Sequence, residues 1–349
     1  MSPKYQRVYL TAMGYELGPE VVTSDELEER LAPVYKRLNL QAGQLEAWTG
    51  ISERRWWQKD ARLSQGAAAA AGKALAKAGV KAADVGVLIY AGVCRENFEP
   101  ATACAVADAL GVRNAVSVYD LSNACLGVLN GMIDIANRIE LGQIRAGIVV
   151  SCETSREINE IAISNLLHGA GMDQFAEALA TFTGGSGAVA MLLTDGSFPG
   201  EKGHRLLGAV SQVAPEHHAL CRWGLETSSE GMQSQYMATD SVSVLKYGVL
   251  LGQKTWQIFL AEMGWTAANL ERVICHQVGS GHQDAILKTL GIPKEKDFTT
   301  FRFLGNMGTA ALPVTAAIAE ERGVLKRGQK VAFLGIGSGL TCLMMGLEW

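Results

Sequence analysis

The spacing of apolar and polar residues along the chain predicts an α/β protein. Short apolar runs predict buried strands at residues 6–12, 85–90, 146–151 and 184–193. Apolar residues at intervals of three and four, with capping signals at several starts, predict helices between these strands. The expected helices cover residues 23–38, 64–78, 99–110, 153–180 and 243–263. The polar stretch at 214–243 predicts a long connection or a cap over the fold.

An internal repeat divides the chain into two similar parts. Residues 75–90 align with residues 260–275 without a gap, and six of the sixteen pairs are identical. The same order continues in two further pairs, 121–125 with 304–308 and 147–153 with 331–337. One offset near 185 residues (260 minus 75) indicates two copies of an α/β unit rather than a solenoid. We therefore predict an N-terminal half at 1–195 and a C-terminal half at 196–349, with function between them.

Composition and charge narrow the classes of function. Hydrophobic residues make up 48% of the 349-residue chain, enough for the core of one large α/β unit or of two domains. The net charge of −4 and the lack of a basic block argue against nucleic acid as a partner. The sequence leaves open an acidic acyl carrier protein that docks on a local basic patch at 54–55 or 322–327.

Neither a secretory signal nor a membrane span is expected. The first residues lead into a strand-like stretch, and no apolar run approaches the roughly 18 residues that a span needs. The seven cysteines form no C-x-x-C pair and lie mostly in apolar strands. This pattern predicts a reducing, cytoplasmic setting and argues against both a disulfide framework and a metal site.

The most informative candidate is Cys125, at a turn between a predicted strand and a predicted helix. The strand begins at residue 118, small polar residues break it, and apolar residues then recur at helical spacing over 126–136. A cysteine at the first turn of a helix meets exposed N–H groups and the positive end of the dipole, which lower the thiol pKa. An isolated cysteine is more often a small core residue, so its interpretation as a nucleophile depends on its neighbours.

Two residues of the C-terminal half complete a candidate constellation. His276 follows the strand that repeats residues 85–90, and Asn306 lies at the turn that repeats the cysteine turn. Such positions at the carboxyl ends of strands usually carry the chemistry of α/β sheets. A cysteine near a histidine can form an acyl thioester, and a neutral histidine with an asparagine can hydrogen-bond a thioester carbonyl that becomes an enolate. Taken singly, His276 could be a core histidine and Asn306 a turn residue.

On these motifs the chain resembles the thiolase superfamily and, within it, the β-ketoacyl-acyl carrier protein synthase III group. The matching segments run in family order across nearly the whole chain: Thr49-Gly-Ile-Ser-Glu-Arg-Arg55, Asn123-Ala-Cys125, His276-Gln277, Gly305-Asn-Met-Gly308 and Gly335-Ile-Gly-Ser-Gly-Leu340. The resemblance implies a duplicated, five-layered αβαβα fold, a homodimer, and acyl-CoA as a substrate. The terminal G-x-G-x-G lacks the Rossmann spacing, so no dinucleotide or other cofactor is expected.

The resemblance also implies roles for individual residues. Cys125 would be the acylated nucleophile, and His276 with Asn306 would activate the second acyl donor. The oxyanion hole would consist of the backbone N–H groups of Cys125 and Ser338. Arg54, Arg55 and Trp56 are similar to an Arg–Trp pair that stacks on the CoA adenine in the family, although packing in a core or an interface explains them equally well.

Glu99 distinguishes between activities within the superfamily. Residues 95–103 resemble the OleA family, whose members join two fatty acyl-CoA molecules head to head without decarboxylation. There a glutamate before a proline reaches into the partner subunit's site as general base, and Glu99 matches that position. Removal of an α-proton from a plain thioester requires such a base. The competing interpretation is an acid in the first turn of a helix that starts at Pro100.

These residues are compatible with three functions. The leading hypothesis is an acyltransferase that joins two fatty acyl-CoA molecules by Claisen condensation to a 2-alkyl-3-keto acid. The alternative is a decarboxylating 3-oxoacyl-acyl carrier protein synthase III that uses malonyl-carrier protein and does not need Glu99. The third is a catalytically silent thiolase-fold partner, against which the joint presence of Cys125, His276 and Asn306 argues.

Overall fold

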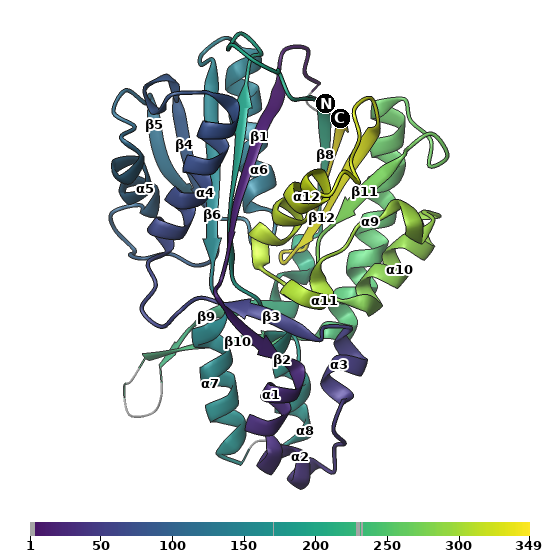
Figure 1. The fold of residues 1–349 in the computed structure, drawn as a ribbon. Helices are drawn as coiled ribbons and strands as arrows, with labels where there is room; N and C mark the ends of the chain where they lie inside the picture. Colours follow the sequence, from purple (N-terminus) through teal and green to yellow (C-terminus); the bar gives the residue numbers. More distant parts are fainter. Residues whose placement is uncertain (1–3, 170, 228–230, 232) are drawn as a thin grey trace.

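The computed structural model of the protein describes residues 4–169, 171–227, 231 and 233–349. Nine strands form its central sheet: β1 (Tyr9–Leu17), β4 (Val87–Ala91), β5 (Ser117–Leu121), β6 (Ala146–Glu153), β7 (Gly187–Thr194), β8 (His204–Val213), β11 (Arg272–Cys275), β12 (Lys330–Gly337) and β13 (Thr341–Glu348). Their order across the sheet is β11-β12-β13-β8-β1-β7-β6-β4-β5 (Figure 1). β4, β6 and β7 are buried at every position, which explains why they read as continuous apolar runs in the sequence.

The sheet repeats one pairing pattern in the two halves of the chain. In the N-terminal half β4 pairs in parallel with β6, while β7 pairs antiparallel with both β6 and β1. In the C-terminal half β11 pairs in parallel with β12, while β13 pairs antiparallel with both β12 and β8. β1 and β8 join the halves through only two residue pairs, Tyr9 with Arg205 and Leu10 with His204. The predicted boundary at 195/196 lies in the connection between β7 and β8.

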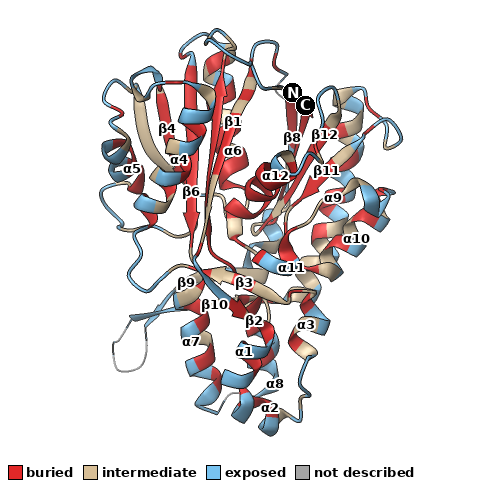
Figure 2. Ribbon diagram, viewed as in Figure 1, coloured by how far each residue is buried: buried red, intermediate tan, exposed pale blue. Residues whose placement is uncertain are grey.

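Helices cover the sheet in an order that gives five layers. The helices concerned are α4 (Leu63–Ala78), α5 (Thr102–Leu110), α6 (Gly127–Glu140), α9 (Ser241–Met263), α10 (Ser280–Leu290) and α12 (Ala311–Glu321). α4 and α5 pack on the N-terminal strands, and α9 and α10 pack on the C-terminal strands. α6 and α12 lie between the two sets of strands and share one apolar cluster with both, and Figure 2 shows these helices as largely buried. The predicted duplicated αβαβα fold is confirmed.

A smaller layer covers one end of the five layers, at the bottom of Figure 1, and has its own apolar cluster. It consists of β2 (Glu20–Thr23), β3 (Glu53–Trp56), α1 (Ser24–Arg30), α2 (Ala32–Leu38), α3 (Gln44–Thr49), α7 (Arg156–Leu167) and α8 (Met172–Ala178). The predicted capping box forms between Thr23 and Glu26 at the start of α1. The single helix expected over 23–38 is divided at Leu31, because Pro33 lacks the N–H that would continue the hydrogen-bond ladder.

The helix expected to begin at residue 99 begins three residues later. The carboxylate of Asp120 accepts hydrogen bonds from the N–H groups of Thr102 and Ala103, both at 2.9 Å. A negative charge at this point favours the positive end of the dipole and fixes the first turn of α5 there. Glu99 and Pro100 therefore lie in the exposed loop before the helix, and the interpretation of Glu99 as a first-turn acid is wrong.

The polar stretch at 214–243 contains a hairpin that the sequence did not predict. Its strands are β9 (Cys221–Thr227) and β10 (Gln233–Thr239), and they pair antiparallel apart from the main sheet. Both strands are mostly exposed or half-buried, so no apolar alternation marks them in the sequence. Residues 228–230 and 232 lie outside the described part of this stretch.

Two features are absent from the described residues. No helix there is both long enough and apolar enough to cross a lipid bilayer. No three histidine, cysteine or acidic side chains gather there in a way that could hold a metal ion. All seven cysteines are unbonded thiols.

Candidate active site

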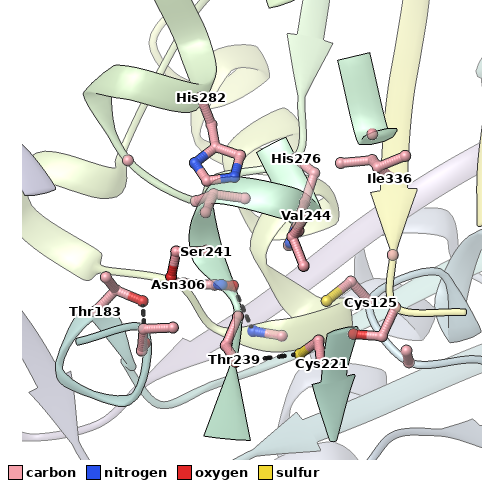
Figure 3. Close-up of a pocket in the computed structure, with 18 of the residues that line it drawn as sticks. Cys125, Thr183, Cys221, Thr239, Ser241, Val244, His276, His282, Asn306 and Ile336 are labelled. Atoms are coloured by element: carbon pink, nitrogen blue, oxygen red, sulfur yellow. Dashed lines mark hydrogen bonds between the residues drawn. The ribbon is translucent and has the colours of Figure 1, made fainter. Parts of the chain in front are cut away.

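One cavity of about 700 Å³ brings together residues from both halves of the chain (Figure 3). Cys125, His276, Asn306 and Ser338 all line it, although they come from four separate segments. Residues of α7, α9 and the β9-β10 hairpin complete its mostly apolar wall. An apolar cavity with a few convergent polar groups is the usual form of a small-molecule site.

Cys125 lies on a tight turn between β5 and α6. Ala124, just before it, has a left-handed backbone with a φ of 44°, a conformation that costs a non-glycine residue roughly 1–3 kcal/mol. The start of α6 is fixed because the N–H of Val128 donates to the hydroxyl of Thr309 at 2.8 Å. Gly337 on β12 allows the close approach of this turn, since a Cβ there would lie 3.4 Å from the backbone nitrogen of Cys125. The strand–turn–helix predicted around Cys125 is confirmed.

Burial, and not the helix dipole, dominates the acidity of the Cys125 thiol. Although part of its surface faces the cavity, the surrounding protein removes most bulk water and raises its pKa to about 12. The charges of Cys221 and Glu153 act in the same direction, while the backbone N–H groups of Cys125 and Ser338 offset the rise only in part. The prediction of a lowered pKa is therefore wrong, and the thiol carries its proton at pH 7. The two N–H groups expected to form an oxyanion hole both lower the pKa of this thiol, and their role as an oxyanion hole stays a prediction.

His276 follows β11 and is held neutral by its surroundings. Its backbone N–H donates to the carbonyl oxygen of Leu334 at 2.9 Å, which ties the residue to β12. Burial, together with a smaller effect of the charge of nearby His282, lowers the pKa of His276 to about 4. The Nδ1 atom is buried and has no hydrogen-bond partner within the described ranges. A neutral imidazole that lines the cavity can therefore bond to a ligand without carrying charge.

Asn306 lies on the turn between α11 (Phe301–Leu304) and the short 3-10 helix Gly308–Ala310. Its backbone N–H donates to Thr183 at 2.8 Å, and its backbone carbonyl accepts from Gly185 at 2.9 Å. Its side-chain oxygen accepts a hydrogen bond from the N–H of Gly308 at 3.1 Å. Because the oxygen is bonded within the turn, the NH2 group is the end of the amide that can donate to a ligand in the cavity.

Arg54 and Trp56 lie in the interior of the small layer, and neither lines the cavity. Arg54 is fully buried, and its guanidinium donates to two backbone carbonyls and the hydroxyl of Ser24 at 3.3, 3.1 and 3.1 Å. Trp56 is only 2% exposed. Neither side chain can stack on a CoA adenine, so the predicted binding role is wrong for both and core packing explains them. Arg55 is half-buried, does not line the cavity, and its role stays a prediction.

Glu99 also lies outside the cavity of its own chain. It is exposed in the loop before α5, beside Phe98, whose surface is 95% exposed. Since Glu99 does not line the cavity that holds Cys125, its predicted role as a base requires the site of a partner subunit. That role stays a prediction.

Glu153, Cys221 and Trp48 are among the cavity residues that were not expected from the sequence. Glu153 is the last residue of β6, and its place at the carboxyl end of a central strand is a signal that could have identified it. Cys221 begins β9, so its place depends on the hairpin, which had no recognisable pattern. Trp48 on α3 is 44% exposed and packs edge to face with Phe175, and it brings an aromatic ring to the cavity wall.

Comparison with known proteins agrees with this geometry. Residues 47–184 match the family described as "Thiolase, N-terminal domain", and residues 260–349 match "3-Oxoacyl-[acyl-carrier-protein (ACP)] synthase III C terminal". A Shewanella oneidensis protein named acyl-CoA:acyl-CoA alkyltransferase is 54% identical over 348 residues, which cover 99% of this chain and 100% of that protein. A protein of the same name from Xanthomonas campestris pv. campestris is 35% identical and covers 99% of each chain. The chain belongs to the acyl-CoA:acyl-CoA alkyltransferase family.

A solved structure of a related protein has the fold that was expected for this chain. A crystal structure of Xanthomonas campestris OleA with bound lauric acid and lauroyl-CoA matches with a TM-score of 0.92 at 34% identity, and the match covers 99% of this chain and 100% of that one. The resemblance to the thiolase superfamily and to OleA is thereby confirmed, and the protein is an acyltransferase of the alkyltransferase family.

Proposed function

We propose that the protein joins two fatty acyl-CoA molecules head to head, without decarboxylation, and forms a 2-alkyl-3-keto acid. The observation that carries the proposal is the convergence of Cys125, His276 and Asn306 on one apolar cavity. It occurs in a chain that is 54% identical, over its full length, to an acyl-CoA:acyl-CoA alkyltransferase. The lauroyl-CoA bound to Xanthomonas campestris OleA supports fatty acyl thioesters as the substrate class.

In the first step Cys125 takes the acyl group of one acyl-CoA. Its sulfur attacks the thioester carbonyl, the bond to the CoA sulfur breaks, and the thiol proton leaves with CoA. The backbone N–H groups of Cys125 and Ser338 stabilise the negative charge that develops on the carbonyl oxygen. Because the pKa of the thiol is about 12, the proton moves during the attack and not before it.

In the second step His276 and Asn306 bind the carbonyl oxygen of the second acyl-CoA. A base removes the α-proton, and hydrogen bonds from the neutral imidazole and the amide NH2 stabilise the enolate. The α-carbon then attacks the acyl carbonyl on Cys125, and the Cys125 thiolate leaves and regains its proton. Hydrolysis of the remaining thioester by one water gives the keto acid and the second CoA.

We assign the base to the partner subunit's Glu99 in a homodimer. The exposed position of Glu99 outside its own cavity supports this assignment, as does its match to the OleA family. A carboxylate is needed here because no decarboxylation generates the carbanion. A protein that remains fully active when diluted to monomers contradicts the assignment.

Incubation of the pure protein with lauroyl-CoA alone tests the proposal. We expect release of many CoA molecules per chain, followed as free thiol, and an acyl adduct on Cys125, detected by the intact mass. Glu99→Gln should still take up the acyl group and should lose turnover. Asp108→Asn is the matched control, since Asp108 is exposed on α5 and lies outside the cavity.

The same assay separates the other functions. The match of residues 260–349 to the synthase III family keeps the decarboxylating synthase as the second candidate. That enzyme would release one CoA per chain, turn over only with a malonyl donor, and tolerate Glu99→Gln. A chain that forms no adduct with any acyl donor would be a silent partner.

The proposal also covers the cofactor, the cellular compartment and the acyl donor. The chemistry of an acyl thioester needs no cofactor beyond the substrates, because Cys125 carries the acyl group itself. Seven unbonded thiols support a cytoplasmic setting, where such thiols stay reduced. Delivery of one acyl group by an acyl carrier protein is tested by replacing lauroyl-CoA with lauroyl-carrier protein in the same assay.

A further inference from the structure

Glu153 is a buried carboxylate in the wall of the cavity, and no step of the proposed reaction uses it. It is the last residue of β6, is 3% exposed and lines the same cavity as Cys125. Burial raises the pKa of Glu153. A carboxyl group in an apolar wall costs folding free energy unless hydrogen bonds compensate for the lost water. The identity of those hydrogen bonds therefore indicates what the residue does.

The two oxygens of Glu153 hold the loop that follows β4. Oε1 accepts a hydrogen bond from the N–H of Val93 at 3.0 Å, and Oε2 accepts one from the N–H of Cys94 at 3.1 Å. The same loop continues to Glu99, five residues after Cys94. One bidentate contact thus fixes the start of the loop that carries the proposed base.

The same carboxyl group contacts the turn that carries Asn306. It accepts a hydrogen bond from the backbone N–H of Thr309, and a Cβ on Gly308 would lie 3.3 Å from its carboxyl carbon. The hydroxyl of Thr309 in turn accepts the N–H of Val128 at the start of α6. A single side chain therefore joins the loop of the base, the turn of the enolate donor and the helix behind the nucleophile.

We propose that Glu153 is a positioning residue for the condensation step. It holds the loop of Glu99 and the turn of Asn306 in the relative positions that this step needs. This inference rests on the proposed function. Acylation of Cys125 depends on its own turn and on the N–H group of Ser338, neither of which bonds to Glu153. If Glu99 serves the partner subunit, loss of Glu153 affects deprotonation in the partner's site and enolate binding in its own.

Glu153→Gln is the first test, because the amide keeps the shape but replaces one acceptor with an NH2 group that faces a backbone N–H. Two quantities are measured with lauroyl-CoA: the single-turnover rate of Cys125 acylation, by intact mass, and the steady-state release of CoA. Loss of the Glu153 charge removes one cause of the raised pKa of the Cys125 thiol, so we expect acylation at the wild-type rate or faster. We expect turnover to fall by about 10- to 100-fold, as expected when reacting groups are misplaced. Glu177→Gln is the matched control, since Glu177 is exposed on α8.

Gly308→Ala tests the same contact from the other side. Its backbone is left-handed, with a φ of 54°, and the added methyl group presses on the carboxyl group of Glu153. We expect the same separation of normal acylation from slow turnover, with rates normalised to the fraction of chains that take up an acyl group. The inference would be overturned if acylation and turnover fell by the same factor in both variants. It would also be overturned if Glu153→Gln turned over at the wild-type rate. Failure of the wild-type protein to acylate or to turn over contradicts the proposed function instead.

Discussion

Replacement of Gly248 by leucine should shorten the acyl chain that the protein accepts. Gly248 and Gly252 lie one turn apart on the face of α9 that lines the cavity. A Cβ on Gly248 would lie 3.7 Å from Ile336 of β12, and one on Gly252 would lie 2.9 Å from Ile286 of α10. At Gly252 Ile286 already occupies the place of a side chain, whereas at Gly248 there is room for one beside Ile336. We infer an acyl channel that runs from Cys125 along α9 past Gly248.

The size of the effect follows from the number of methylenes that the leucine displaces. A leucine at position 248 fills the channel at this point and removes the contacts of the chain atoms beyond it. At about 0.8 kcal/mol for each buried methylene, displacement of about three methylenes costs about 2.4 kcal/mol. That free energy corresponds to a roughly 60-fold fall in kcat/KM for a long acyl chain.

A chain-length series measures this effect. CoA release is followed with saturated acyl-CoA substrates from butyryl-CoA to palmitoyl-CoA, for the wild type, Gly248→Leu and Gly72→Leu. Gly72 lies on α4 with open space around the position of a Cβ, so its variant controls for a leucine placed in a helix. We expect only Gly248→Leu to shift the optimum to shorter chains while short substrates keep their rates. A uniform fall at every length, or an unchanged optimum, would refute the assignment of the channel.

Two further results should follow from buried groups. Arg54→Met should lower the free energy of unfolding by about 2–4 kcal/mol relative to Arg55→Met, because it leaves buried acceptors without a donor. Chemical denaturation measures this, and a higher KM for acyl-CoA at wild-type stability would restore the CoA-binding role. The pKa of His276 is about 4 in the folded protein and about 6.5 in the unfolded chain, so as the pH falls the unfolded chain takes up the proton before the folded protein does. The free energy of unfolding should therefore fall by up to about 3 kcal/mol between pH 6.5 and pH 4. In His276→Asn the free energy of unfolding, measured by denaturant titration, should depend less steeply on pH between 6.5 and 4. Some dependence should remain because the pKa of His282 is also lowered. A pH dependence equal to that of the wild type would contradict the buried neutral imidazole.

The nucleophile, the histidine and the asparagine could be located from the sequence because local order and internal symmetry both mark them. Each follows a short apolar run, and the repeat of 75–90 at 260–275 sets the two halves against each other. In the structure β4 and β11 occupy equivalent places in their halves, so the loops after them open toward the same cavity. The hairpin at β9 and β10 has no such repeat and no apolar face, which is why Cys221 was missed.

The role of the β3 residues could not be predicted from the pattern of residues along the chain. Their burial alternates, so Arg54 and Trp56 point inward while Glu53 and Arg55 are half-exposed. Period-two alternation places Arg54 and Trp56 on one face, but it does not say whether that face meets a ligand or the protein. The answer depends on the apolar cluster of the small layer, in which segments distant in sequence, such as β3 and α7, come together.

Desolvation also explains why the base of the proposed reaction lies outside the cavity. The pKa shifts of Cys125, His276 and Glu153 all favour the uncharged form, and loss of water is the largest cause of each. In such surroundings hydrogen bonds to an oxyanion or an enolate are stronger than in water, which suits Claisen chemistry. The same surroundings make a resident carboxylate a poor choice as a base, because burial opposes its ionisation before any substrate arrives. A glutamate on an exposed loop keeps its hydration, and the structure holds Glu99 on such a loop, as its proposed role in the site of a partner subunit requires.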